Sequence, residues 1–99
     1  MMNPKYEVRE STPPTLEEAQ AFVDGYVEMV SLADGSQLLI NEEGKLFGKP
    51  YNAEATNAAY NAGNNWFGTE DVIVGNAWHL KEKARWLDYS LDLFIIINH

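Results

Sequence analysis

The sequence predicts an α+β fold in which a mostly antiparallel sheet of four to six strands packs against two principal helices. The stretch from Gly25 to Gly48 alternates short apolar runs with turn sequences, a pattern typical of a β-meander. A helix-start sequence precedes this stretch, and an alanine-rich segment follows it. Both can cover the sheet, and 99 residues are enough for one domain spanning residues 1–99.

Before the meander, the sequence predicts an extended arm and then a helix. Residues 1–14 are expected to form the arm, in which Tyr6 and Val8 alternate with charged residues as they would in a short edge strand. Thr15 is the predicted N-cap of the helix, and Glu18 completes a capping box three residues later. Apolar residues then recur at helical spacing, and Gly25 ends the helix.

The meander itself predicts strands at residues 26–32, 37–40 and 45–47. Asp34 and Gly35 predict a two-residue type I′ turn, because both residues tolerate positive φ. We expect Gly25 and Gly44 to occupy positions that require positive φ as well.

The second half of the chain predicts a helix and further strands. Asn52 is the expected N-cap of a helix over residues 52–62, and Gly63 ends it. Residues 71–74 and 77–80 read as strands, and the mixed-charge residues 81–87 as a short helix. Residues 91–97, LDLFIII, predict a strand that is interior to the sheet or that pairs with a second copy in a homodimer.

The chain is strongly acidic, with 15 Asp and Glu against 7 Lys and Arg and a net charge of −8. This balance disfavours direct binding to nucleic acid and favours a protein partner with a basic surface. The candidate partner-binding face consists of the acids between the first helix and the second turn: Glu17, Glu18, Asp24, Glu28, Asp34, Glu42 and Glu43. The alternative interpretation is that these acids serve solubility and the helix dipole alone.

A second candidate site is a cluster of aromatic and amide side chains around the second helix. Its members are Tyr51, Asn52, Asn57, Tyr60, Asn64, Asn65 and Trp66. Such side chains suit a small polar, nucleotide-like ligand or a hot spot for a protein partner. The alternative is that the asparagines are caps and turn residues while Tyr60 and Trp66 belong to the core.

The residues that usually carry catalysis are scarce. The chain has no cysteine, and its two histidines, His79 and His99, are too few for a zinc site without carboxylate ligands. No serine lies in a nucleophile motif, and sequence-adjacent acids such as Glu17 and Glu18 point apart on a helix. We therefore expect no cofactor and no catalysis. An opening without a signal-peptide pattern, and apolar runs too short to cross a bilayer, predict a cytoplasmic protein without membrane contact.

Four separated blocks of sequence resemble one known family. They are GYVE at 25–28, INEEGKL at 40–46, PYNAEAT at 50–56 and DVIVG at 71–75. Together they resemble the domain-of-unknown-function family numbered 3846, which occurs in bacteriophages and plasmids. The segment around Trp66 and the residues after Leu80 depart from that pattern. The resemblance implies a mobile-element protein in a bacterial cell and supplies no catalytic residues.

These observations predict a small acidic accessory protein of a phage or mobile element, which binds and modulates a host protein without catalysis, with inhibition as the expected form of modulation. A sharper form of this hypothesis is that the acids between Glu10 and Glu43 mimic the charge of nucleic acid. A module that sequesters a nucleotide-like ligand is the first alternative, and an enzyme is the second.

Overall fold

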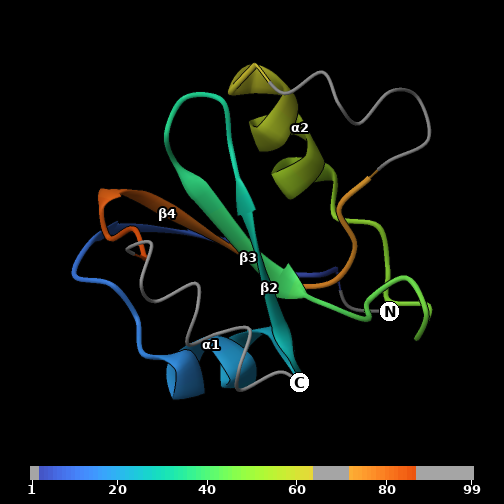
Figure 1. Ribbon diagram of the computed structural model, residues 1–99. Coiled ribbons are helices and arrows are strands. Elements are labelled where there is room, and N and C mark those ends of the chain that lie inside the picture. The colour runs from blue at the N-terminus through green and yellow to red at the C-terminus, as the bar shows by residue number, and fades with distance from the viewer. Residues whose placement is uncertain (1–2, 64–71, 87–99) are drawn as a thin grey trace.

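The computed structural model describes residues 3–63 and 72–86. In chain order its elements are β1 (Tyr6–Ser11), α1 (Leu16–Val23), β2 (Val27–Ser31), β3 (Gln37–Asn41), α2 (Ala53–Asn61) and β4 (Ala77–Lys83) (Figure 1). The strands form one sheet in the order β1-β4-β3-β2. Strand β1 runs parallel to β4, and the other two pairings are antiparallel. The predicted α+β fold with a mostly antiparallel sheet is confirmed, and the predicted N-terminal edge strand is β1.

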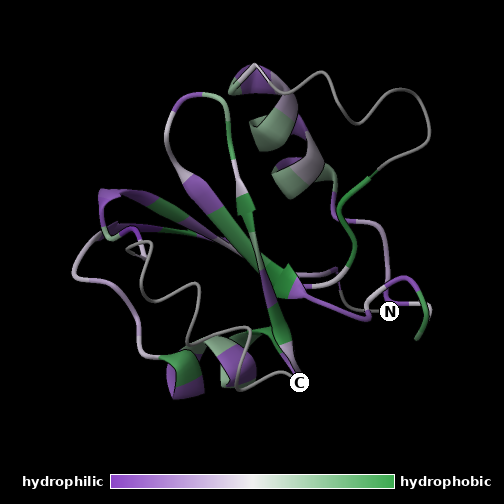
Figure 2. Cartoon of the chain, viewed as in Figure 1, coloured by the Kyte–Doolittle hydropathy of each residue, from purple (hydrophilic) through white to green (hydrophobic). Residues whose placement is uncertain are grey.

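The two helices cover opposite faces of this sheet (Figure 1). Successive strand residues point to opposite faces, so Leu39 packs toward α1 while Leu38 packs toward α2. The α1 face buries Ala19, Val23, Val27, Leu39, Leu80, Ala84 and Trp86. The α2 face buries Leu32, Leu38, Ala55, Ala59, Ile73 and Ala77. Figure 2 shows these apolar stretches as green along the strands between the helices.

Helix α1 begins and ends as the sequence predicts. The Thr15 side chain accepts a hydrogen bond from the Glu18 N–H (3.0 Å), and the Glu18 carboxylate accepts one from the Thr15 N–H (2.9 Å). At the other end, Asp24 takes the left-handed conformation and Gly25 follows with a φ of 149°. A Cβ on Gly25 would lie 2.7 Å from Nδ2 of Asn41, which donates to the carbonyls of Val23 and Asp24. Gly25 is therefore required by its backbone conformation and by this close approach.

The predicted hairpin joins β2 to β3, but its turn is not of type I′. The Leu32 carbonyl accepts from the Gly35 N–H (3.0 Å), and the Leu32 N–H donates to the Ser36 carbonyl (2.8 Å). Gly35 has a φ of 92°, whereas Asp34 is not among the residues with positive φ. This is the three-residue loop in which a type I turn precedes a left-handed glycine. The Asp34 carboxylate favours it by accepting from the Ser36 N–H, as in an Asx turn.

The strand predicted at residues 45–47 is wrong, because residues 42–48 form consecutive turns. The Glu43 carbonyl accepts from the Phe47 N–H (3.0 Å), and the Gly44 carbonyl accepts from the Lys49 N–H (2.9 Å). Gly44 does not have positive φ, in contrast to the prediction. A Cβ there would instead lie 3.0 Å from Cγ2 of Val74, so this glycine allows close packing.

Two further element predictions are corrected near β4. Residues 72–74 form no strand, since Val74 makes only an isolated bridge to Tyr51, and Asp71 lies outside the described residues. Residues 81–83 continue β4 rather than starting a helix, because β1 extends beside them and Ser11 pairs with Lys83. The predicted strand at 91–97 also lies outside the described residues.

Helix α2 confirms the predicted N-cap and shows a second use for it. The Asn52 side-chain oxygen accepts from the Ala55 N–H (3.0 Å). Its amide nitrogen donates to the carbonyls of Lys5 (2.9 Å) and Gly75 (2.8 Å). One buried side chain thus joins the start of α2, the approach to β1 and the loop before β4.

Trp86 fixes the chain that leaves β4 against the α1 face. Its backbone N–H donates to the Gln37 side-chain oxygen (2.7 Å), and its carbonyl accepts from the Gln37 amide (2.9 Å). The indole N–H donates to the Pro14 carbonyl (2.9 Å). These bonds satisfy the polar groups of a large aromatic residue in the core.

Candidate functional site

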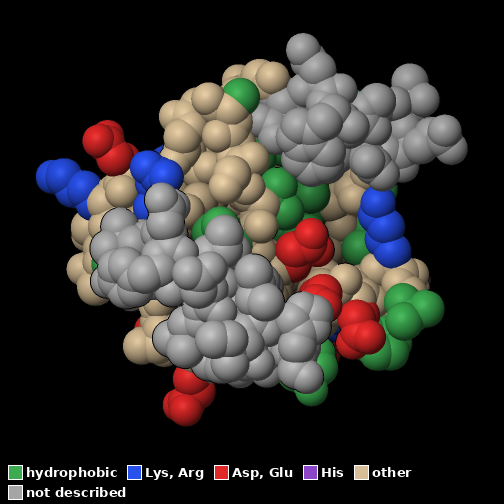
Figure 3. All heavy atoms as spheres, viewed as in Figure 1, with side chains coloured by type: hydrophobic (Ala, Val, Ile, Leu, Met, Phe, Trp, Pro, Cys, Tyr) green, Lys and Arg blue, Asp and Glu red, His purple; other side chains and the backbone are tan. Residues whose placement is uncertain are grey.

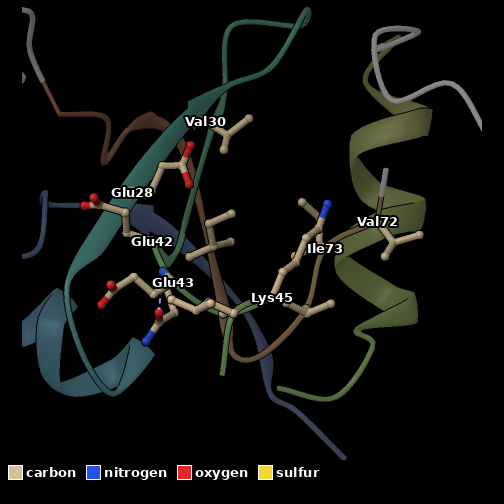
Figure 4. Close-up of a pocket in the computed structure, with 12 residues that line it drawn as sticks. Glu28, Val30, Glu42, Glu43, Lys45, Val72 and Ile73 are labelled. Carbon is tan, nitrogen blue, oxygen red and sulfur yellow. Dashed lines mark hydrogen bonds between the residues drawn. The ribbon is translucent and has the colours of Figure 1, made fainter. Parts of the chain in front are cut away.

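A hollow of about 340 Å³ lies where the β2–β3 hairpin meets residues 72–74. Its apolar lining includes Val30, Ile40, Val72, Ile73 and Val74, and its acidic lining is Glu28, Glu42 and Glu43. Figure 4 shows the three glutamates on one side of the hollow and Val72 and Ile73 on the other, with Lys45 between them. Apolar and acidic groups therefore meet in one concave surface.

The alternation of side chains along the hairpin creates this combination. Val27 lies in the α1-side core, so Glu28 and Val30 point to the α2 side of the sheet. Ile40 is the partner of Glu28 in the β2–β3 register and shares that side. Helix α2 packs over the other end of the hairpin, at Leu38, and Val30 and Ile40 are only partly buried. The end of the sheet near Glu28 is consequently left as a hollow.

The charges in this hollow are close enough to influence one another. Burial of the Glu28 carboxyl raises its pKa, and the neighbouring Glu42 carboxylate raises it further. The Lys45 ammonium group acts in the opposite direction. The ionised form of Glu28 is thus disfavoured in the folded chain, and a cation placed in the hollow would favour it.

A second, shallower hollow shares Glu43 with the first. It is lined by Glu17, Gln20, Ala21, Gly25, Tyr26 and Glu43. Tyr26 is 52% exposed here, and Leu46 on the rim of the first hollow is 77% exposed. We call this continuous surface the acidic edge and define it by Glu17, Tyr26, Glu28, Glu42, Glu43 and Leu46. Figure 3 shows acidic side chains gathered beside hydrophobic ones on this face of the molecule.

The other three acids of the predicted face lie outside the acidic edge and have partners within the chain. Glu18 is part of the α1 capping box, and Asp24 forms an ion pair with Lys49 (3.3 Å). Asp34 accepts hydrogen bonds from the N–H and the hydroxyl of Ser36. The hydrogen bonds with Thr15 lower the pKa of Glu18. The hydrogen bonds from Ser36 lower the pKa of Asp34. The structure thus brings together four of the seven predicted acids.

The aromatic and amide cluster is divided by the fold. Tyr51, Asn57 and Tyr60 are exposed. Asn52 is 2% exposed and donates both of its amide hydrogens within the chain. Asn64, Asn65 and Trp66 lie outside the described residues.

The structure also contains a chain of polar side chains that sequence reasoning missed. The Tyr6 hydroxyl lies 2.7 Å from Nδ1 of His79, and Nε2 of His79 lies 2.8 Å from Oγ of Ser36. Oγ of Ser36 donates to the Asp34 carboxylate at 2.6 Å. The Asx-turn sequence Asp34-Gly35-Ser36 was visible, but the pairing of Leu38 with His79 that brings the turn to β4 was not.

This polar chain resembles a serine–histidine pair, but its hydrogen bonds run in the opposite direction. Ser36 has one hydroxyl hydrogen, which it donates to Asp34, so Nε2 of His79 must donate to Ser36. Nδ1 of His79 then accepts from Tyr6. A nucleophilic serine needs the histidine to accept its proton, and here it cannot. Because Ser36 and His79 are also 5% and 3% exposed, we interpret the chain as a buried structural connection.

In residues 3–63 and 72–86, no three His, Asp or Glu side chains come together as a metal-binding group. Over the same ranges, no helix has the length and apolar character needed to span a membrane.

The helix-covered sheet and the acidic edge define a small α+β protein whose candidate site is an open surface. The chain belongs to the family described as Domain of unknown function (DUF3846), whose model matches residues 1–91. The family resemblance inferred from the four sequence blocks is therefore confirmed. Searches of curated proteins and of solved structures found no match to the chain.

Proposed function

We propose that this protein binds a basic protein partner through the acidic edge and carries out no chemistry itself. The observation that carries this proposal is the grouping of Glu17, Glu28, Glu42 and Glu43 around two adjoining hollows. Exposed Tyr26 and Leu46 on the same surface add the apolar contacts that binding hot spots use. The net charge of −8 would attract a basic partner from a distance and speed association.

The bacteriophage and plasmid setting of the family resemblance makes a host protein the first partner to test. By covering a basic surface that the host protein uses for another purpose, the chain would inhibit it. Mimicry of nucleic-acid charge is one form of this proposal, and it predicts competition between the chain and nucleic acid for the same surface.

The test compares two triple variants with equal charge change. The first replaces Glu28, Glu42 and Glu43 of the acidic edge with glutamine. The second replaces Glu7, Glu10 and Glu82, which are exposed on β1 and β4. Each variant removes three of the negative charges from the net −8, so they differ only in where the charge is lost.

Tagged wild-type chain and both variants are used to capture partners from bacterial lysate at low and moderate salt. We expect the wild type and the β1/β4 variant to retain the same basic protein, and the acidic-edge variant to lose it. Capture should weaken as salt rises, because exposed charges are screened within about 10 Å at 0.1 M salt. Equal capture by both triple variants would contradict the assignment of binding to the acidic edge.

A further inference from the structure

We propose that the hollow between Glu28 and Val74 receives a lysine or arginine side chain of the partner, together with an apolar neighbour of that residue. The partner segment is then basic and amphipathic rather than uniformly cationic. This inference rests on the proposed function and specifies the chemistry of the segment that occupies the acidic edge.

The lining of the hollow matches such a side chain along its length. Lysine and arginine have an aliphatic stem that packs on apolar surface and a charged end that stays near polar groups. Val30, Ile40 and Val74 supply apolar surface, while Glu28 and Glu42 supply the negative charge. At about 340 Å³ the hollow lies near the lower end of the range of about 300–1,000 Å³ for ligand pockets, so it fits one or two side chains.

The carboxylates favour a cationic occupant. Burial and the nearby Glu42 carboxylate both raise the pKa of Glu28 and so disfavour its ionised form. The Lys45 ammonium group lowers this pKa, but only in part, because the pKa of Glu28 remains raised. A cationic group in the hollow would offset the repulsion between the two glutamates and gain charge-assisted hydrogen bonds. A second copy of this chain is disfavoured as the occupant by its own net charge of −8.

The rim offers a fixed apolar contact next to the hollow. Leu46 is 77% exposed and Phe47 is 65% exposed, both within the turns at residues 42–48. Backbone hydrogen bonds of Phe47, Gly48 and Lys49 hold these turns. A contact surface that is already ordered loses little conformational entropy on binding, so Leu46 can contribute to affinity for an apolar residue of the partner.

Two short synthetic peptides of equal length and charge test the inference with the full chain. One alternates lysine with leucine, and the other alternates lysine with serine. We expect the lysine–leucine peptide to bind about tenfold more tightly, because only its leucines add apolar burial. Amide shifts in the NMR spectrum should locate the bound peptide at Glu28, Ile40 and Val74.

Single variants with matched controls assign the contacts. Glu28→Gln and Leu46→Ser should each weaken binding of the lysine–leucine peptide by about three- to tenfold. Their controls, Glu7→Gln and Val8→Ser, change exposed residues on β1 at the opposite edge of the sheet and should leave binding unchanged.

The outcomes separate this inference from the proposed function. Equal binding of both peptides, weakened by Glu28→Gln but not by Leu46→Ser, would overturn the amphipathic segment and leave a charge-only acidic edge. If both peptides bind and no acidic-edge variant changes their affinity, the hollow is not the binding site. That result would also count against the proposed function. Concentration-dependent dimerisation that the peptide suppresses would identify a second copy as the occupant and overturn the inference.

Discussion

At the scale of single residues, His79 shows how a buried polar group is accommodated. It lies on β4 and is bonded on one side to Tyr6 from β1 and on the other to Ser36 from the hairpin turn. Because Ser36 donates its hydroxyl hydrogen to Asp34, each donor in the hydrogen-bonded series Tyr6–His79–Ser36–Asp34 has one acceptor. No proton is left over, so the neutral histidine is the form that fits.

This assignment predicts the tautomer of His79. At pH 7 the hydrogen should be on Nε2, with Nδ1 accepting from the Tyr6 hydroxyl. Long-range ¹H–¹⁵N NMR correlations distinguish the two ring nitrogens, and a His99→Gln variant assigns the remaining signal to His79. Tyr6→Phe, which removes the donor to Nδ1, should shift the Nδ1 resonance. A hydrogen on Nδ1 in the wild type would contradict the direction of the whole series.

The same residue predicts a pH dependence of stability. Burial lowers the pKa of His79 below its ordinary 6.5, Lys81 lowers it further, and Asp34 and Glu10 act in the opposite direction. The unfolded chain therefore binds more protons than the folded chain below about pH 6.5, and stability falls as the pH is lowered through this range. Urea unfolding from pH 8 to pH 5 of the wild type beside a His79→Gln variant, which keeps every other titrating group, measures the effect. The same pH dependence of stability in both chains would contradict it.

Glu28 predicts a stability change of opposite sign. Its raised pKa means that the folded chain disfavours the charged form, but the Glu28 side chain is exposed on β2 and solvent screens the effect, so Glu28→Gln should stabilise the chain at pH 7 only slightly, by less than about 0.5 kcal/mol. The gain should shrink as the pH falls through the folded-state pKa and vanish below the ordinary value of 4.5. Urea unfolding of this variant beside Glu7→Gln at pH 7 and pH 4 measures both effects. A Glu28→Gln variant less stable than wild type at pH 7 would show that the carboxylate is stabilising.

At the scale of elements, the start of α2 depends on a residue that sequence reasoning placed in two roles. Asn52 was predicted as an N-cap and also as a member of a ligand cluster. The structure confirms the cap and uses the remaining amide hydrogens to join α2 to the backbone at Lys5 and Gly75. This use follows from the tertiary fold, which places those carbonyls beside the cap.

A pair of alanine variants measures the contribution of this connection. Asn52→Ala removes the cap and two hydrogen bonds to backbone carbonyls, and we expect a loss of about 2–4 kcal/mol in the free energy of unfolding. Asn57→Ala changes an exposed position in the same helix and should alter that free energy by about 0.5 kcal/mol or less. Urea unfolding of both variants makes the comparison. Equal losses would show that Asn52 acts only through helix propensity.

Elements with signals inside one short window were predictable, and those set by distant residues were not. The α1 capping box and the Asn52 cap can each be recognised within four consecutive residues. Residues 45–47 have the composition of a strand, but the turn bonds to Glu43 and Gly44 leave them no strand partner. Residues 81–83 form a strand because β1 lies beside them, which their mixed charge does not reveal.

At the scale of the whole molecule, the excess of acid was visible in the sequence, but its distribution was not. Along β2, alternation of side chains places Val27 in the α1-side core and exposes Glu28 on the other face. The hollow beside Glu28 arises because residues 72–74 return to the hairpin end, a contact between segments about 30 residues apart in the chain. The buried connection from Tyr6 to Asp34 depends on three strand pairings at once, so no local pattern could predict it.

The net charge predicts that salt affects stability and binding in opposite directions. The chain has 15 acidic side chains but only seven Lys and Arg, so the excess negative charges repel one another in the compact state. Salt ions screen these charges and reduce the repulsion. Raising the salt concentration at pH 7 should therefore raise the thermal unfolding midpoint, while it weakens capture of a basic partner. Near the isoelectric point of about 4.5 the stabilising effect should disappear, because the net charge is then close to zero.

Replacing Glu28, Glu42 and Glu43 with glutamine should reduce the salt response more than replacing Glu7, Glu10 and Glu82, since only the first set is crowded in one hollow. Calorimetric scans of the two triple variants at low and moderate salt measure this difference. Equal salt responses would show that the repulsion is spread over the whole surface rather than concentrated at the acidic edge.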